Sequence, residues 1–72
     1  MNLETQFAKL ERRAAKARHT IAEVLQEAAV PRLSYWRAKE GKYAKQDTSI
    51  AVLRACEGAL DRIEENQRKA KS

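Results

Sequence analysis

Two arginines, Arg32 and Arg37, lie close together in this sequence, with apolar and hydroxyl side chains between them. A guanidinium group can donate two parallel hydrogen bonds to guanine O6 and N7, and Leu33 can contact a thymine methyl group. Trp36 can pack along sugars or donate its indole N–H to a phosphate, and Ser34 can reach a phosphate, a base or nearby backbone. The predicted base contacts to DNA are therefore Arg32, Leu33, Ser34, Trp36 and Arg37.

The hydrophobic core is the alternative place for Trp36, because tryptophan is highly buried on average. On a helix, Tyr35 and Ala38 share a face with Val30 and should pack inward, which leaves Trp36 outside. A rotation of that helix by one residue would bury Trp36 and expose Tyr35 instead. The sequence leaves this rotation open.

The residues before this segment predict a helix with a defined start. Thr20 and Glu23 form the pattern T-x-x-E, in which the hydroxyl accepts from the Glu23 amide and the carboxylate accepts from the Thr20 amide. After this capping box, apolar residues recur at helical spacing and predict one buried face. They are Ile21, Val24, Leu25 and Ala28.

A tight turn and a short helix are predicted next. Ala29 stands where the backbone should turn left-handed, at a cost on the order of 1 kcal/mol, and Val30 supplies an apolar plug. The helix is predicted from Pro31, whose missing N–H costs nothing in a first turn, to Glu40. Gly41 follows as the C-terminal cap. Two helices joined by so short a turn have the spacing of a helix-turn-helix.

Two longer helices flank this helix-turn-helix unit, which covers residues 20–41. The first is predicted over residues 3–18, with Asn2 as its N-cap. Its apolar residues step by four and three along the chain: Leu3, Phe7, Leu10, Ala14 and Ala17.

The last helix is predicted over residues 49–67, capped by Asp47 or Thr48, with a frayed tail over residues 68–72. Together these elements predict a single all-α domain over residues 1–72. Its expected architecture is a compact four-helix fold with a central helix-turn-helix and a long C-terminal helix.

Basic charge is concentrated in two stretches of a chain that has 15 Lys and Arg, 10 Asp and Glu, and a net charge of +5. Residues 9–18 and residues 32–45 each hold five basic residues and one acidic residue. A phosphate-facing surface requires such segregation, although a solvated helix face is the alternative, particularly for Arg12, Arg13 and Lys16. The predicted phosphate contacts are Thr20, Lys39, Lys42, Tyr43 and Lys45.

The small size of the chain predicts a homodimer, because a core of 72 residues is marginal alone. The apolar sector of the last helix is wide enough for one edge to pack inside the subunit and the other to meet a second subunit. The predicted dimer interface is Val52, Cys56, Ala59 and Ile63, and the first helix is the alternative that the sequence leaves open for the subunit contact. Cys56 lies between the two edges and is also expected to behave as a small buried hydrophobe.

Metal, cofactor and membrane sites are not expected from this sequence. A single cysteine excludes an internal disulfide, and one cysteine with one histidine does not match any familiar zinc spacing. No apolar run approaches the length of a membrane span and no signal-peptide pattern begins the chain, so a cytoplasmic protein is expected. No small-molecule ligand is evident.

Residues 20–41 resemble the lambda repressor/Cro-type helix-turn-helix family of small phage or mobile-element regulators, and residues 47–63 are similar to the helix that follows. The matching positions are Thr20, Val24, Ala28, Ala29, Val30, Arg32, Ser34, Tyr35 and Gly41. Three residues depart from the family pattern: Leu25 replaces a frequent Ala, Ala29 a frequent Gly, and Ala38 a larger apolar residue. The resemblance implies a cytoplasmic, usually dimeric transcriptional regulator that binds an inverted repeat.

The sequence thus predicts a homodimeric, sequence-specific DNA-binding regulator, most simply a repressor that occupies a promoter. Two other classes stay open. One is a helical protein-interaction module, similar to an antitoxin or inhibitor, and the other is an excisionase-like architectural DNA binder. An enzyme is not expected, because the sequence offers no nucleophile–base pair, carboxylate pair or glycine-rich phosphate loop.

Overall fold

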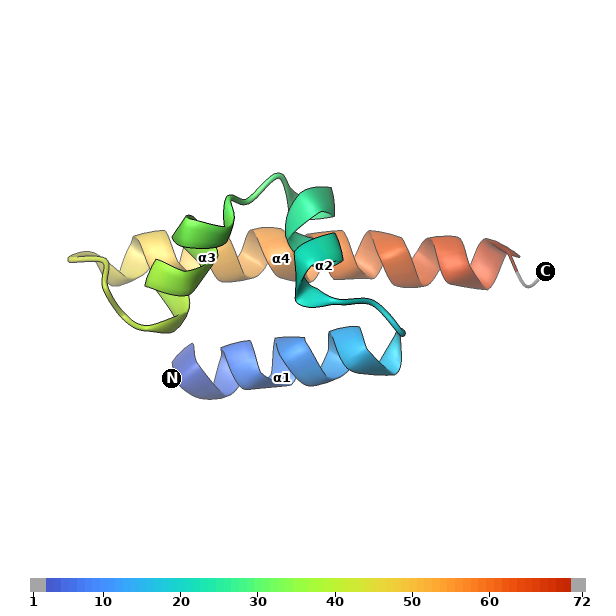
Figure 1. The fold of residues 1–72 in the computed structure, drawn as a ribbon, viewed down its shortest axis with the longest axis horizontal. Coiled ribbons are helices and arrows are strands. Elements are labelled where there is room, and N and C mark those ends of the chain that lie inside the picture. Colours follow the sequence, from blue (N-terminus) through green and yellow to red (C-terminus); the bar gives the residue numbers. More distant parts are fainter. Residues whose placement is uncertain (1–2, 71–72) are drawn as a thin grey trace.

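Residues 3–70 form four α-helices, of which three pack against the longest one. A computed structural model describes residues 3–70. The helices are α1 (Leu3–Lys16), α2 (Ile21–Ala28), α3 (Arg32–Lys39) and α4 (Gln46–Ala70). Helix α4 runs the length of the domain, α1 lies alongside it, and α2 and α3 lie over it in the view of Figure 1.

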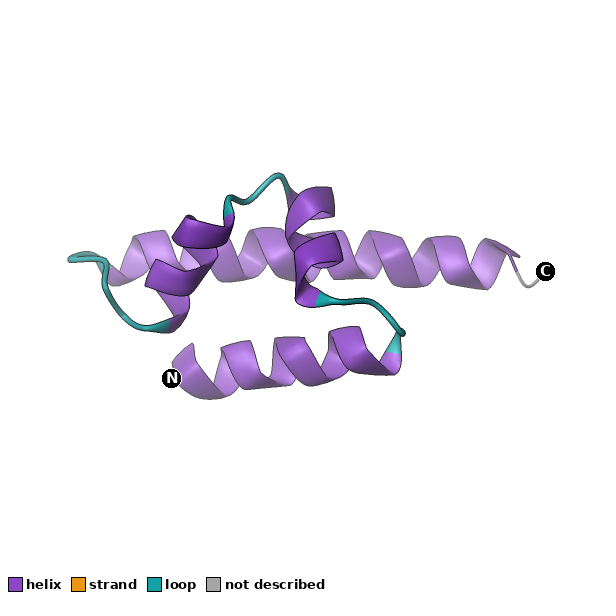
Figure 2. Ribbon diagram, in the orientation of Figure 1, coloured by secondary structure: helices purple, strands orange, loops and turns teal. Residues whose placement is uncertain are grey.

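All regular structure in residues 3–70 is helical, with short connections between the helices (Figure 2). This confirms the predicted all-α, four-helix class. The predicted N-cap Asn2 and the last two residues of the predicted tail lie outside the described residues.

The hydrophobic core lies where α4 meets the other three helices. Phe7 of α1, Val24 of α2, and Cys56 and Leu60 of α4 are completely enclosed. The ring of Phe7 packs edge-on against Tyr35 of α3, with ring centroids 5.5 Å apart and planes at 83°. Aromatic pairs favour this edge-to-face geometry. The core therefore joins α1 directly to α3, in addition to the contacts that both make with α4.

Helices α1, α2 and α3 are each followed, within two residues, by a residue in the left-handed conformation. These residues are Arg18 (φ 62°), Ala29 (φ 57°) and Gly41 (φ 70°). In each case this residue and the next donate their amides to carbonyls of the last helical turn, the Schellman pattern. After α2, for example, the Val30 N–H donates to the Leu25 carbonyl at 2.9 Å. The left-handed turns predicted at Ala29 and Gly41 are confirmed, and the turn at Arg18 is an addition.

Two predicted helix boundaries near this unit were wrong. Helix α1 ends at Lys16 rather than at residue 18, because the left-handed Arg18 reverses the chain. Helix α3 begins at Arg32, since Pro31 has extended backbone (φ −61°, ψ 145°) and lies before the first helical turn. Pro31 is thus the last residue of the turn and not the first residue of the helix.

Helix α4 is longer at both ends than the sequence indicated. It begins at Gln46, so Asp47 and Thr48 lie inside its first turn instead of capping it. It continues to Ala70, so the frayed tail predicted from residue 68 was wrong for the part that the structure describes. Near this end the Gln67 side-chain amide donates to the Ala17 carbonyl at 2.7 Å, which fastens α4 to the end of α1.

Candidate nucleic-acid interface

The start of α2 is fixed by the capping box that the sequence predicted. The Glu23 N–H donates to Thr20 Oγ1 at 3.2 Å, and the Thr20 N–H donates to Glu23 Oε1 at 2.9 Å. The bond from the Thr20 amide, with further hydrogen bonds from His19 and the Thr20 hydroxyl, lowers the pKa of the Glu23 carboxyl. The helix therefore begins at a defined residue, which places the turn and α3 after it.

The rotation of α3 about its axis is settled by burial. Tyr35 and Ala38 lie in the core at 7% and 1% exposure, whereas Trp36 is 50% exposed and Leu33 is 55% exposed. Leu33 and Trp36 are the large hydrophobic side chains exposed in the described part of the chain, and both lie on this helix. The predicted inward face of α3 is therefore correct, and the alternative with Trp36 in the core is wrong.

The outer face of α3 has an apolar centre with a basic residue on each side. Successive helical residues turn by about 100°, so the order of side chains around this face is Arg32, Trp36, Leu33, Arg37. All four are exposed. Ser34 is half-buried at the edge of the face, where the sequence placed it. The structure thus brings the five predicted base-contacting residues onto one helix, with four of them facing outward.

One carboxylate of α1 holds α3 in this orientation. The Tyr35 hydroxyl donates to Glu11 Oε2 at 2.7 Å, and Lys39 Nζ donates to the same oxygen at 2.7 Å. Burial raises the pKa of Glu11, but hydrogen bonds from Lys39 and Tyr35 outweigh burial and lower it on balance. Burial and the neighbouring Glu11 raise the pKa of Tyr35. Sequence reasoning missed Glu11, whose only signal was its place as the single acid in a basic stretch.

The predicted phosphate contacts lie in different environments. Lys42 and Lys45 are exposed in the loop after α3, and Tyr43 is half-buried against the core. Lys39 is paired with Glu11, and the exposed Thr20 uses its hydroxyl in the capping box. Lys42 and Lys45 are thus the members of this set whose side chains are most accessible to an anion.

The basic residues of α1 separate into paired and exposed ones. Arg13 donates to Glu64 Oε1 at 2.6 Å and also to Asp61, both on α4. These carboxylates raise the pKa of the Arg13 guanidinium. Arg12 and Lys16 are exposed. Arg13 therefore links α1 to α4, while the other two residues lie on the outer surface of α1.

The four residues predicted to form a dimer interface lie on one side of α4 but differ in burial. Cys56 and Ala59 are completely buried inside the subunit, where a second chain cannot reach them in this fold. Burial raises the pKa of the Cys56 thiol to about 11, with a contribution from Glu57. Val52 and Ile63 are partly exposed. The prediction of an interface through Cys56 and Ala59 is thus corrected, because they pack against the other helices of the same subunit.

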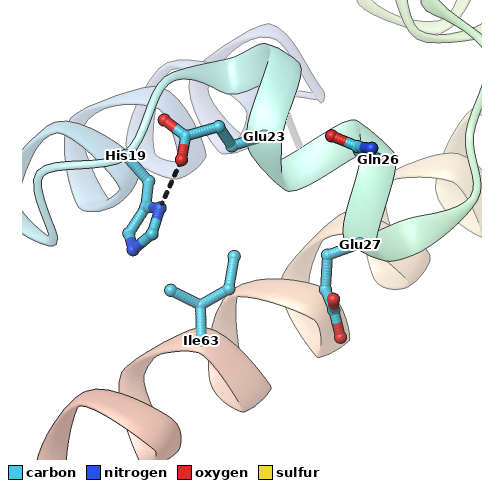
Figure 3. A pocket seen from close by; sticks show the side chains of 5 residues that line it. All are labelled: His19, Glu23, Gln26, Glu27 and Ile63. Atoms are coloured by element: carbon cyan, nitrogen blue, oxygen red, sulfur yellow. Dashed lines mark hydrogen bonds and ion pairs between the residues drawn. The ribbon is translucent and has the colours of Figure 1, made fainter.

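An open hollow lies between α2 and α4. It is lined by His19, Glu23, Gln26, Glu27 and Ile63 (Figure 3). Its carboxylates have partners within the chain: Glu23 Oε2 lies 3.1 Å from His19 Nδ1, and Glu27 Oε1 accepts from Arg62 Nε at 3.0 Å. Such acidic walls do not suit a phosphate. Residues 3–70 contain no group of His, Cys, Asp and Glu side chains arranged to hold a metal ion.

Comparisons of this chain with protein-family models, curated proteins and solved structures found no match. Among residues 3–70, no helix combines the length and the apolar character needed to cross a membrane.

Proposed function

We propose that this protein is a cytoplasmic, sequence-specific regulator of transcription that binds double-stranded DNA through α3 in the major groove. The observation that supports this most is the outer face of α3, where exposed Leu33 and Trp36 lie between Arg32 and Arg37. Two adjacent large apolar side chains favour an interface over plain solvent. Base edges can cover them while guanines or phosphates accept from the arginines.

The surroundings of α3 support the same function. The buried Tyr35 and its bond to Glu11 fix the helix, so its outer face is presented without rearrangement. Lys42 and Lys45 extend the basic surface beyond the end of α3. Thr20, the predicted contact at the start of α2, already shares its amide and hydroxyl with Glu23, so Lys42 and Lys45 are the main phosphate contacts in this proposal. Phosphate contacts from this loop would set the register of α3 in the groove.

We further propose that the protein acts as a homodimeric repressor on an inverted repeat. Two recognition helices related by a two-fold axis would lie about 34 Å apart, one turn of DNA. Of the four residues predicted for the interface, Val52 and Ile63 are partly exposed and are candidates for the subunit contact. Occupation of a promoter by such a dimer is sufficient for repression. No catalytic activity or small-molecule ligand is part of this proposal.

The test is a selection of bound duplexes from a random double-stranded DNA library, followed by gel shifts with the enriched duplex and a scrambled duplex. We expect an enriched inverted repeat that binds about 1,000-fold or more tightly than the scrambled duplex at physiological salt. Equal binding of both duplexes would contradict sequence specificity. If no duplex binds at low salt and the protein instead captures a single protein partner, the interaction-module class replaces this proposal.

A further inference from the structure

We propose that α3 recognises two neighbouring A·T base pairs by their thymine methyl groups, which Leu33 and Trp36 cover. This inference rests on the proposed DNA-binding function and names the kind of sequence that is bound. Leu33 and Trp36 lie at the centre of the outer face of α3, with their exposed sides between Arg32 and Arg37. An operator core that contains thymines, flanked by guanines or phosphates, matches this arrangement of apolar and basic groups.

The spacing of the two side chains fits neighbouring base pairs. Three residues along a helix correspond to a rise of about 4.5 Å, and base pairs are stacked about 3.4 Å apart. Leu33 and Trp36 are separated by three residues and lie about 60° apart around the axis. A helix that follows the groove therefore brings each of them to its own base pair, rather than both to one.

The chemistry of the major groove restricts which base pairs these are. Among the groups presented there, the thymine C5-methyl is apolar, whereas the others are hydrogen-bond donors or acceptors. A leucine placed against guanine O6 or the cytosine amino group would remove water from it without supplying a hydrogen bond, which is costly. Leu33 therefore favours thymine, and the large ring of Trp36 can cover a second methyl group beside it.

Charge favours DNA over a protein surface as the occupant of this apolar pair. Arg32 and Arg37 lie on the two sides of it, and Lys42 and Lys45 lie beyond the end of the helix. Two acidic residues lie by α3: Glu40 follows it directly, and Glu11 of α1 is already paired with Lys39. DNA with thymines in its major groove is complementary to this pattern, because the thymine methyl groups can meet the apolar pair while the flanking phosphates meet the basic residues.

The experiment replaces thymine by uracil, which removes only the C5-methyl group. The duplex selected with the wild-type protein is synthesised with deoxyuridine at one thymine position at a time, and then at both positions of each neighbouring pair. We expect an affinity loss of roughly fourfold for each contacted methyl, and more than tenfold for the pair. Uracil at thymines outside the contacted pair should leave the affinity unchanged and serves as the internal control.

Variants assign the methyl contacts to their residues. For Leu33→Ala, the exchange of thymine for uracil at one of the two positions should leave the affinity almost unchanged. For Trp36→Ala, the same should hold for the exchange at the neighbouring position. Lys42→Ala is the matched control: it should weaken both duplexes and leave their affinity ratio unchanged. Helical circular dichroism checks that the variants fold, and the base substitutions test the wild-type protein independently of any variant.

Two outcomes would overturn this inference while leaving the proposed function intact. One is a specific operator whose uracil and thymine forms bind with equal affinity. The other is a specific operator whose major-groove core consists of G·C pairs alone. If the selection enriches no duplex at all, the proposed function itself fails, and the inference fails with it.

Discussion

The Tyr35 hydroxyl donates a 2.7 Å hydrogen bond to the Glu11 carboxylate, joining α3 to α1 at the edge of the core. The same carboxylate oxygen accepts from Lys39, one helical turn further along α3. Two donors from one helix converge on a single acceptor from another. Any rotation of α3 would break at least one of these bonds, so Glu11 helps to determine which side chains face outward.

Replacing Glu11 should therefore affect both stability and DNA binding. Glu11→Gln keeps an acceptor for the Tyr35 hydroxyl but loses the negative charge that attracts Lys39. We expect the free energy of unfolding to fall by about 1 kcal/mol in urea titrations, because the ion pair is partly exposed. Glu40→Gln, which removes the same charge from an exposed glutamate outside this contact, is the control. Equal stability of Glu11→Gln and wild type would show that this contact does not hold α3.

The pKa of Glu11 also predicts how stability responds to acid. Because the folded-state pKa lies below the ordinary glutamate value, the folded protein binds a proton less readily than the unfolded chain. The stabilisation from Glu11 is complete above the unfolded pKa and is lost as the pH falls through the lower, folded pKa. Between about pH 5 and pH 3, wild type should lose more stability than Glu11→Gln in urea titrations. Parallel pH profiles for the two proteins would contradict this.

Much of the fold could be predicted from local patterns, because each pattern has a local physical cause. The T-x-x-E box and Gly41 mark helix ends through hydrogen bonds between residues close in sequence. The left-handed turn at Arg18 was not predictable in this way, since arginine has no preference for that conformation. The chain reverses direction at Arg18, which lets α2 pack on the core, and this packing stabilises the turn.

The sequence indicated that the candidate residues lie on one short helix, but it did not determine the rotation of that helix. Helical spacing placed Tyr35 and Trp36 on different faces, yet either could serve as a core aromatic. The deciding partners, Phe7 and Glu11, come from another helix and leave no local signal in the sequence of α3. The same limitation applies to Cys56, because a wide apolar sector does not reveal which edge the other helices cover.

Arg37 and Lys42 should have different effects on DNA binding. Arg37 lies on the outer face of α3, whereas Lys42 lies in the loop beyond it. Arg37→Ala should reduce affinity for the selected operator by about 1–3 kcal/mol and relax base preference at one position. Lys42→Ala should weaken specific and scrambled duplexes alike and reduce the slope of log affinity against log salt by about one. Gel shifts at several salt concentrations measure both effects.

An Arg37→Ala protein that binds the operator like wild type would remove Arg37 from the site. A Lys42→Ala protein with an unchanged salt slope would remove Lys42 from the phosphate contacts. Both residues are exposed. Neither substitution should alter the unfolding midpoint, which separates a binding effect from a folding effect.

The left-handed backbone of Ala29 predicts a stabilising substitution. At φ 57° the Cβ atom of Ala29 is crowded against the following carbonyl oxygen, and Ala29→Gly removes this atom. We expect a gain of about 0.5–1 kcal/mol in the free energy of unfolding, after the extra entropy of glycine in the unfolded chain is subtracted. Ala22→Gly, on an exposed helical residue of α2, is the matched control and should cost about 1 kcal/mol. A loss of stability in Ala29→Gly would contradict the assigned strain.

The buried thiol of Cys56 should be almost unreactive in the folded protein. Its pKa is raised to about 11, so at pH 8 only about one molecule in a thousand carries the reactive thiolate, and the core also blocks the reagent. A thiol-specific colorimetric disulfide reagent should modify Cys56 at least about 100-fold more slowly in buffer than in urea. In buffer the reagent reaches this thiol only when the protein unfolds transiently. Ala51→Cys adds an exposed thiol on the same helix as an internal fast-reacting control. Because Cys56 is enclosed within one subunit, its reaction rate should rise with added urea in proportion to the unfolded fraction. A rate in native buffer equal to that of the Ala51→Cys thiol would contradict the enclosure of Cys56.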